Sequence, residues 1–222
     1  MAGAFWCIVE DDRAGRPKKV TAELLGEATR LSRQAGGQVE AVWLTDKATD
    51  DGLKQLAEWG ATRVWLLEAP ALAPYRSEVW TAAVAELAGR EAPRAIFGAV
   101  TSRQRELLAR LAARLGAGLS ADSVAFRVED GKLVATRPIY AGKLLSKVSW
   151  AKPPWLATLR PNVFKAEEPK ELFAPRVINP TTQDTWRYDV TPDGQRFLIN
   201  TIPDADSDFV NVIQNWQGLL KQ

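Results

Sequence analysis

The sequence predicts an α/β fold in which helices flank a mostly parallel sheet. Four apolar runs typical of buried strands alternate with four helix-like segments before residue 116. This alternation is typical of parallel sheets, because each crossover between parallel strands needs a connection long enough for a helix. Later, two strand-like runs joined by Asp130-Gly131 predict an antiparallel extension, and a similar pattern near the end predicts a short β-hairpin tail.

The first half of the chain supplies the parallel strands and the helices. Short apolar runs are expected where both faces of a sheet are covered, and these runs are Ala4–Glu10, Gln38–Leu44, Thr62–Glu68 and Arg94–Val100. The helical patterns lie within residues 18–37, 50–60, 77–90 and 102–115. Glycines follow or close these patterns, as is common at helix ends.

The second half is expected to be largely β-structure. The runs before and after Asp130-Gly131 form a hairpin, and Lys143–Trp150 and Trp155–Pro161 read as two further strands. Prolines and paired glutamates then indicate a linker. We therefore expect an α/β domain over 1–165, a linker over 166–184 and a β-hairpin tail over 185–222.

The residues that are missing limit the chemistry. The chain has no histidine, which excludes Ser-His-Asp triads, Cys-His pairs and histidine metal sites. Cys7 is the single cysteine, so no intrachain disulfide can form, and its apolar neighbours predict a buried, inert thiol. Redox work would need a bound cofactor. We expect no catalytic and no metal-binding residues.

Charge and hydropathy limit the partners. Residues 166–222 carry net charge −4 and residues 1–165 carry +6, without aromatic stacking motifs, so we expect no nucleic-acid partner. No apolar run approaches the roughly 18 residues needed to span a bilayer, and no signal peptide is recognised. We expect a cytoplasmic protein without a membrane partner.

Several local patterns invite a functional reading. The first strand is followed by three acidic residues, Glu10, Asp11 and Asp12. They could bind a metal or act in acid–base chemistry at the strand end. We favour the alternative interpretation, a solvated acidic loop. Residues Gly116–Ala121 have the G-x-G-x-x-A spacing of a dinucleotide-binding motif. That motif requires a strand before it and a helix after it, whereas this segment follows a helix and precedes a strand. We therefore interpret it as a loop that ends the helix. Tryptophans inside expected strands should be core or interface residues, and these are Trp6, Trp43 and Trp65.

The helix that starts after Arg94–Val100 raises a sharper question. Thr101 and Ser102 are natural N-caps, and a phosphate could also sit at this helix start. Leu111 should face the core, whereas Arg103 should lie on an outer face, where substitution has little effect. Local chemistry alone leaves packing and phosphate binding open.

Four segments in this order resemble the N-terminal domain of the electron transfer flavoprotein alpha subunit: TAELLGEATRL, TSRQRELLARLAARLGAGLSADS, TRPIYAGKLLSKV and ATLRPNVF. The resemblance covers about residues 4–165. The ordered set T-S-x-x-R-[DE]-L, G-L-x-A-D and T-R-P-x-Y-x-G-K is fairly specific. It singles out seven positions whose roles are undetermined: Thr101, Ser102, Arg105, Asp122, Arg137, Pro138 and Lys143.

The resemblance implies an adenine-nucleotide-hydrolase-like fold and an electron carrier rather than an enzyme. It implies a beta-type partner subunit that carries AMP, and flavin dehydrogenases as electron donors. In that family FAD is held mainly by a C-terminal domain, which would begin beyond Pro161. We find no such domain here, so we expect a truncated subunit that acts as an interface scaffold and binds no cofactor alone.

The chain departs from the family pattern at two positions. Gln104 stands where the family usually has glycine, and Ala141 stands near its paired glycines. A side chain at position 104 would hinder close approach of a ligand to the backbone, which favours a structural role in which Thr101 and Ser102 cap the helix.

Residues 172–222 resemble the last blade of a bacterial WD40-like β-propeller. Two alternative functions stay open for the whole chain. One is a non-redox protein-interaction module on the same α/β fold, and the other is an adenine-nucleotide binder.

Overall fold

The computed structural model describes residues 3–12, 14–165, 188–190, 196–199 and 212–214. The chain divides into two units, residues 1–169 and 170–222. The linker expected over 166–184 lies outside the described residues.

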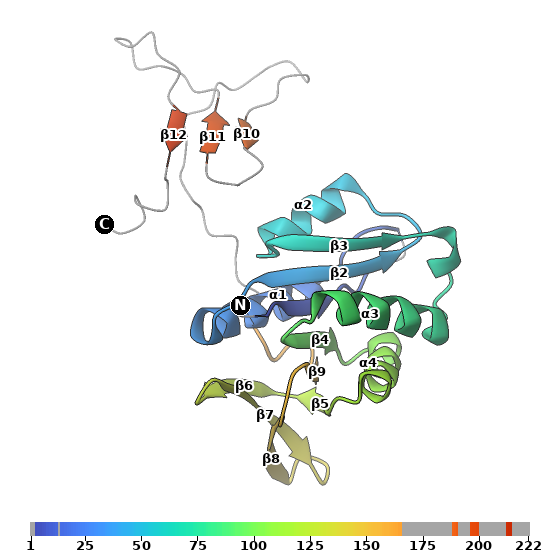
Figure 1. Cartoon of the computed structure of the whole chain (residues 1–222), viewed down its shortest axis with the longest axis vertical. Helices are drawn as coiled ribbons and strands as arrows, with labels where there is room; N and C mark the ends of the chain where they lie inside the picture. The colour runs from blue at the N-terminus through green and yellow to red at the C-terminus, as the bar shows by residue number, and fades with distance from the viewer. Residues whose placement is uncertain (1–2, 13, 166–187, 191–195, 200–211, 215–222) are drawn as a thin grey trace. The chain divides into compact units, whose positions relative to one another are not determined.

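A parallel sheet forms the centre of the first unit (Figure 1). Its six strands are β1 (Phe5–Ile8), β2 (Val39–Thr45), β3 (Arg63–Glu68), β4 (Ala95–Ala99), β5 (Leu119–Ser123) and β9 (Trp155–Leu159). They lie in the order β3-β2-β1-β4-β9-β5, and every neighbouring pair is parallel. The predicted mostly parallel sheet is confirmed.

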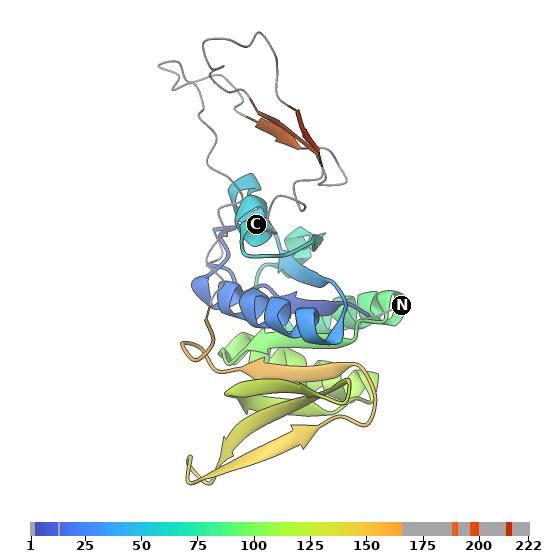
Figure 2. The ribbon, with the colours of Figure 1, turned by 90° about the vertical axis from the view of Figure 1, so that its left-hand side faces the viewer.

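Helices cover both faces of this sheet, as Figures 1 and 2 show. They are α1 (Lys19–Ala35), α2 (Asp50–Glu58), α3 (Ser77–Glu91) and α4 (Ser102–Leu115), with a short 3₁₀ turn, η1 (Pro70–Leu72). Alternate residues of β1 point to opposite faces. Phe5 and Cys7 join the core under α1 and α2, whereas Trp6 and Ile8 join the core under α3 and α4. In the part of the chain that is described, no helix is long and apolar enough to cross a membrane.

The tryptophan and cysteine predictions are confirmed. Trp6 and Trp43 are fully buried in the core. The indole groups of Trp6 and Trp65 both donate to Oε2 of Glu40, at 2.9 and 2.6 Å, which satisfies a buried carboxylate in the middle of the sheet. Cys7 is also buried, and this burial raises the pKa of its thiol, so the group stays protonated and inert.

Two later strands, β9 and β5, belong to the parallel sheet, which the sequence did not predict. Trp155–Leu159 was expected with the antiparallel strands, but β9 lies between β4 and β5 in the parallel sheet. The loop expected over Gly116–Ala121 is only partly correct, because Leu119–Ser123 form β5, an edge strand. The run contains Ser120, Asp122 and Ser123, so its composition does not signal a strand; pairing with β9 overrides this local preference.

The antiparallel part forms a sheet of its own. It consists of β6 (Ala125–Glu129), β7 (Lys132–Ile139) and β8 (Leu144–Ser149), paired in that order. Asp130 and Gly131 both have positive φ, 51° and 72°, as a two-residue hairpin turn requires, so the predicted turn is confirmed. The expected extension of the parallel sheet is therefore a separate sheet, which packs through Phe126, Leu133 and Ala135 on the α1 side of the core.

The second unit contains β10 (Tyr188–Val190), β11 (Arg196–Ile199) and β12 (Val212–Gln214). β11 pairs antiparallel with both of the others. The predicted hairpin corresponds to β10 and β11, and the resemblance to a propeller blade stays a prediction.

Leu111→Ala is expected to lower the free energy of unfolding by roughly 2–5 kcal/mol. Leu111 is fully buried between α4 and the sheet, so the shorter side chain leaves a cavity. Arg114→Ala, at an exposed position one turn later, is the matched control and should change stability by less than about 0.5 kcal/mol. Chemical denaturation followed by circular dichroism measures both, and equal effects would show that this helix face is assigned wrongly.

Candidate functional site at the carboxyl ends of the strands

The strand order reverses direction at β1, which lies between β2 and β4. In open α/β sheets, ligands bind where the connections diverge at the carboxyl ends of such strands. Glu10 and Asp11 follow β1, and Thr101 and Arg103 follow β4. The structure brings these four side chains together.

The two carboxylates are held by side chains of the protein itself. Arg103 reaches Glu10 Oε1 with its guanidinium at 2.8 Å and Asp11 Oδ1 at 3.5 Å. Thr101 donates from its hydroxyl to Glu10 Oε2 at 3.1 Å, and the Trp43 indole donates to Asp11 Oδ2 at 2.9 Å. Both carboxylates therefore have partners inside the domain.

This arrangement corrects two expectations. Glu10 and Asp11 are each 4% exposed, so the solvated acidic loop was the wrong interpretation for them; it holds for Asp12, which is exposed. Arg103 is not a surface residue either. Its side chain is 16% exposed, and its guanidinium lies 5.3 Å from the centre of the Trp80 ring. Among the residues that are described, no group of three or more acidic or cysteine side chains could hold a metal ion.

The start of α4 is built as a structural cap. Thr101 accepts a hydrogen bond on its hydroxyl from the Gln104 backbone N–H at 3.3 Å, and Ser102 is the first helical residue. The Gln104 side chain is completely buried. It donates to the Ile8 carbonyl at 3.1 Å and accepts from the Ala99 N–H at 2.5 Å, so it ties the end of β1 to the end of β4. These bonds occupy the space in front of the helix and support the packing interpretation.

A second charged cluster surrounds Asp122, a residue of the G-L-x-A-D motif. Asp122 has a left-handed backbone, φ 60°, within a register shift of the β5–β9 pair. Arg160 donates from Nε and from one terminal nitrogen to the two carboxylate oxygens, at 2.9 and 2.5 Å. These hydrogen bonds lower the pKa of the Asp122 carboxyl against the opposing effect of desolvation, and the charges of Arg160, Arg105 and Arg137 lower it further.

Backbone hydrogen bonds bring three motif segments to this point. Arg160 N–H donates to Ser123 O at 3.0 Å, Val124 N–H to Thr136 O at 2.8 Å, and Val100 N–H to Leu159 O at 3.0 Å. Each motif contributes one charged residue, and these are Arg105, Asp122 and Arg137. Arg160 lies in the segment ATLRPNVF. The sequence alone does not indicate its ion pair with Asp122, because the two residues are 38 positions apart.

Four of the seven singled-out positions lie elsewhere. Pro138 lies within β7, opposite Leu145 of β8, and Lys143 lies exposed in the turn between these strands. Thr101 and Ser102 lie at the start of α4, with Thr101 turned to the Glu10 cluster rather than to Asp122.

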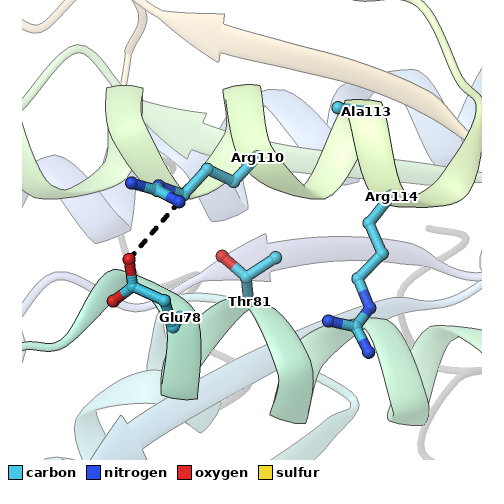
Figure 3. Close-up of a pocket in the computed structure, with 5 residues that line it drawn as sticks. All are labelled: Glu78, Thr81, Arg110, Ala113 and Arg114. Atoms are coloured by element: carbon cyan, nitrogen blue, oxygen red, sulfur yellow. Dashed lines mark ion pairs between the residues drawn. The ribbon is translucent and has the colours of Figure 1, made fainter.

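A shallow groove of about 470 Å³ lies between α3 and α4 (Figure 3). Arg110 and Glu78 form an ion pair of 3.5 Å across it, and the buried Thr81 hydroxyl has no hydrogen-bond partner among the residues that the structure describes. None of the seven singled-out positions lines the groove, and none of its lining residues belongs to the two clusters at the strand ends.

Arg103→Ala is expected to lower the free energy of unfolding by about 3 kcal/mol or more, because it removes the guanidinium from two buried carboxylates and leaves Glu10 with only a longer, 3.9 Å contact to Lys18. The further change Glu10→Gln on the Arg103→Ala background should restore part of the loss. Arg110→Ala, which breaks exposed ion pairs on the same helix, should cost less than about 0.5 kcal/mol. Urea unfolding of the four proteins tests this; if Arg103→Ala matches Arg110→Ala, the buried cluster does not stabilise the fold.

Comparisons with known proteins agree with the motif analysis. The family model described as "Electron transfer flavoprotein domain" matches residues 5–182. Protein FixB of Clostridium saccharobutylicum is 37% identical over 163 residues, which are 72% of this chain and 48% of that protein. The electron transfer flavoprotein subunit alpha of Syntrophomonas wolfei is 37% identical over 73% of this chain and 49% of its own length.

The same protein of Bacillus subtilis is 30% identical over 72% of this chain and 49% of its own length. The chain thus spans about half the length of the curated relatives it matches. A family model that covers most of the chain, together with these relatives, shows that the chain belongs to the electron transfer flavoprotein domain family.

Proposed function

We propose that this chain is an alpha-type subunit of an electron transfer flavoprotein, and that its α/β domain serves as a scaffold for subunit contacts. It takes part in electron transfer from flavin dehydrogenases without supplying a catalytic side chain. Relatives named electron transfer flavoprotein subunit alpha support the alpha type. The cytoplasmic location expected from the sequence is part of this proposal.

The observation that carries the scaffold role is an apolar surface on the β7–β8 hairpin. Tyr140, Leu144 and Leu145 are 74%, 56% and 67% exposed. The hairpin projects from the end of the domain in both views (Figures 1 and 2). Clustered exposed apolar side chains often mark a surface that another protein covers. We propose that a beta-type subunit covers this one.

The backbone of the same hairpin is strained. Tyr140 and Ala141 have φ of 49° and 53°, and Gly142 follows with 86°. Left-handed conformations cost roughly 1–2 kcal/mol at residues with a Cβ. Strain of this kind is often retained where a segment must present a particular shape to a partner. It therefore supports the hairpin as a contact element.

The cofactors belong to the proposal as well. We propose that FAD and AMP, the cofactors that the family resemblance implies, are not held by the α/β domain alone, and that AMP lies in the beta-type subunit. The filled crevice between β1 and β4 supports this, because Arg103 and Gln104 occupy the usual ligand position. The same observation argues against the adenine-nucleotide binder, whereas a non-redox interaction module would share the exposed hairpin.

The double change Leu144→Ser and Leu145→Ser should weaken binding to a beta-type subunit from the same organism at least tenfold. It removes apolar area that the contact would bury. Leu66→Ser, at a residue of β3 that is 40% exposed, is the control and should bind like the unaltered chain. Surface plasmon resonance measures the dissociation constants, and equal binding by all three would exclude the hairpin. A chain that binds no beta-type subunit at all would favour the interaction module.

The 222-residue chain, purified alone with added FAD, should retain no flavin through gel filtration. The physical reason is that the side chains of Thr101 and Gln104 already accept backbone hydrogen bonds at the start of α4, where a phosphate group would bind. The visible absorbance spectrum of the protein fraction gives the result. Flavin bound in stoichiometric amount would contradict the prediction, and adenine nucleotide released on denaturation would support the nucleotide-binding alternative.

A further inference from the structure

The cluster around Asp122 holds more positive charge than its own residues neutralise. Arg160 and Asp122 form one ion pair. Arg105 and Arg137 act on the same carboxyl only through their charges, and within the described residues neither guanidinium has a hydrogen bond or an ion pair. The charges of three arginines thus act on one aspartate, which leaves a net charge of about +2.

One of the unpaired donors is buried. Nε of Arg137 has no acceptor within hydrogen-bond distance in the part of the chain that the structure describes. A buried N–H without an acceptor destabilises the folded chain, so a ligand atom that accepts a hydrogen bond from this Nε would stabilise the arrangement. Arg160 also keeps a terminal nitrogen that Asp122 does not use, because Asp122 accepts from Nε and the other terminal nitrogen.

The position of Arg105 in helix α4 also favours a bound anion. It lies in the early part of α4, a helix whose first turn contains no acidic residue. Cations near a helix N-terminus are disfavoured by the helix dipole, which favours anions there. The carboxylates of Glu10 and Asp11 offset this effect for Arg103, whereas Arg105 has no such partner among the described residues. An anion beside Arg105 would relieve the repulsion.

We propose that Arg105, Arg137 and Arg160, arranged around Asp122, form a binding site for a phosphate group. A guanidinium presents its donors in a planar fork that matches phosphate oxygens, and a dianion matches the excess charge. Asp122 orients Arg160 and, as a nearby negative charge, weakens the binding. The site lies in the α/β domain and is independent of the proposed pairing with a beta-type subunit.

The test is a titration of the full 222-residue chain with inorganic phosphate at constant ionic strength, followed by ¹⁵N–¹H NMR. Saturable shifts are expected for the backbone amides of residues 105 and 122–124 and for the Arg137 Nε–H. Arg105→Gln and Arg137→Gln should each weaken binding roughly tenfold. Arg110→Gln, an exposed arginine on the same helix, should leave the dissociation constant unchanged.

Asp122→Asn separates a binding site from a merely structural cluster. It should tighten phosphate binding severalfold because it removes the competing carboxylate charge, even though it loses the pair with Arg160. Glycerol 3-phosphate in a parallel titration distinguishes a site for free phosphate from one for a phosphate monoester. Shifts that do not saturate, or equal affinities in the unaltered chain, Arg105→Gln and Arg137→Gln, would overturn the proposal.

Discussion

The buried contact of Arg103 with Glu10 and Asp11 decides how the carboxyl ends of the strands are organised. A parallel sheet covered on both faces leaves its strand ends as the main place for polar chemistry. Two carboxylates at the end of the central strand cannot stay buried without a cation. Arg103 contacts both of them from the first turn of α4, closer to Glu10 than Lys18 does, and this requirement fixes the start of that helix against β1. Gln104 then fills the remaining space with hydrogen bonds to both strands. The crevice typical of this fold class is closed by its own side chains.

The partly exposed charged groups of the domain lie instead near β5, where Asp122 pairs with Arg160. The register shift near Asp122 brings its carboxylate to Arg160, beyond the end of β9. Directly after this irregular edge strand, the chain leaves the parallel sheet and builds β6, β7 and β8. One local irregularity therefore places both the arginine cluster and the projecting hairpin on the β5 side of the domain. Bulges often have this effect, because they re-aim side chains and end regular pairing.

The two surfaces serve different chemistry and are separable by experiment. The hairpin surface is apolar, with Leu144 and Leu145 more than half exposed, and suits a protein partner. The cluster around Asp122 is cationic and suits a small anion. Substitution at Leu144 leaves the arginines intact, and substitution at Arg137 or Arg105 leaves the apolar surface intact.

The sequence by itself determined the fold class, the helices and the first four strands, because hydrophobic periodicity and glycine stops are local signals that survive in the fold. It also determined the Asp130-Gly131 turn and, through three ordered motifs, the family. Only the tertiary structure decided where β9 lies, since an apolar run such as Trp155–Leu159 does not encode its neighbours. The sequence also did not indicate that Arg103 contacts the buried carboxylates. Helical spacing placed it on an outer face, but at the first turn of a helix the side chain lies beside the end of the adjacent strand and contacts Glu10, 93 positions away. The arginine cluster depends on contacts of the same kind. Its residues come from α4, β5, β7 and the end of β9, and these elements meet because backbone hydrogen bonds link Val100 to Leu159, Val124 to Thr136 and Arg160 to Ser123.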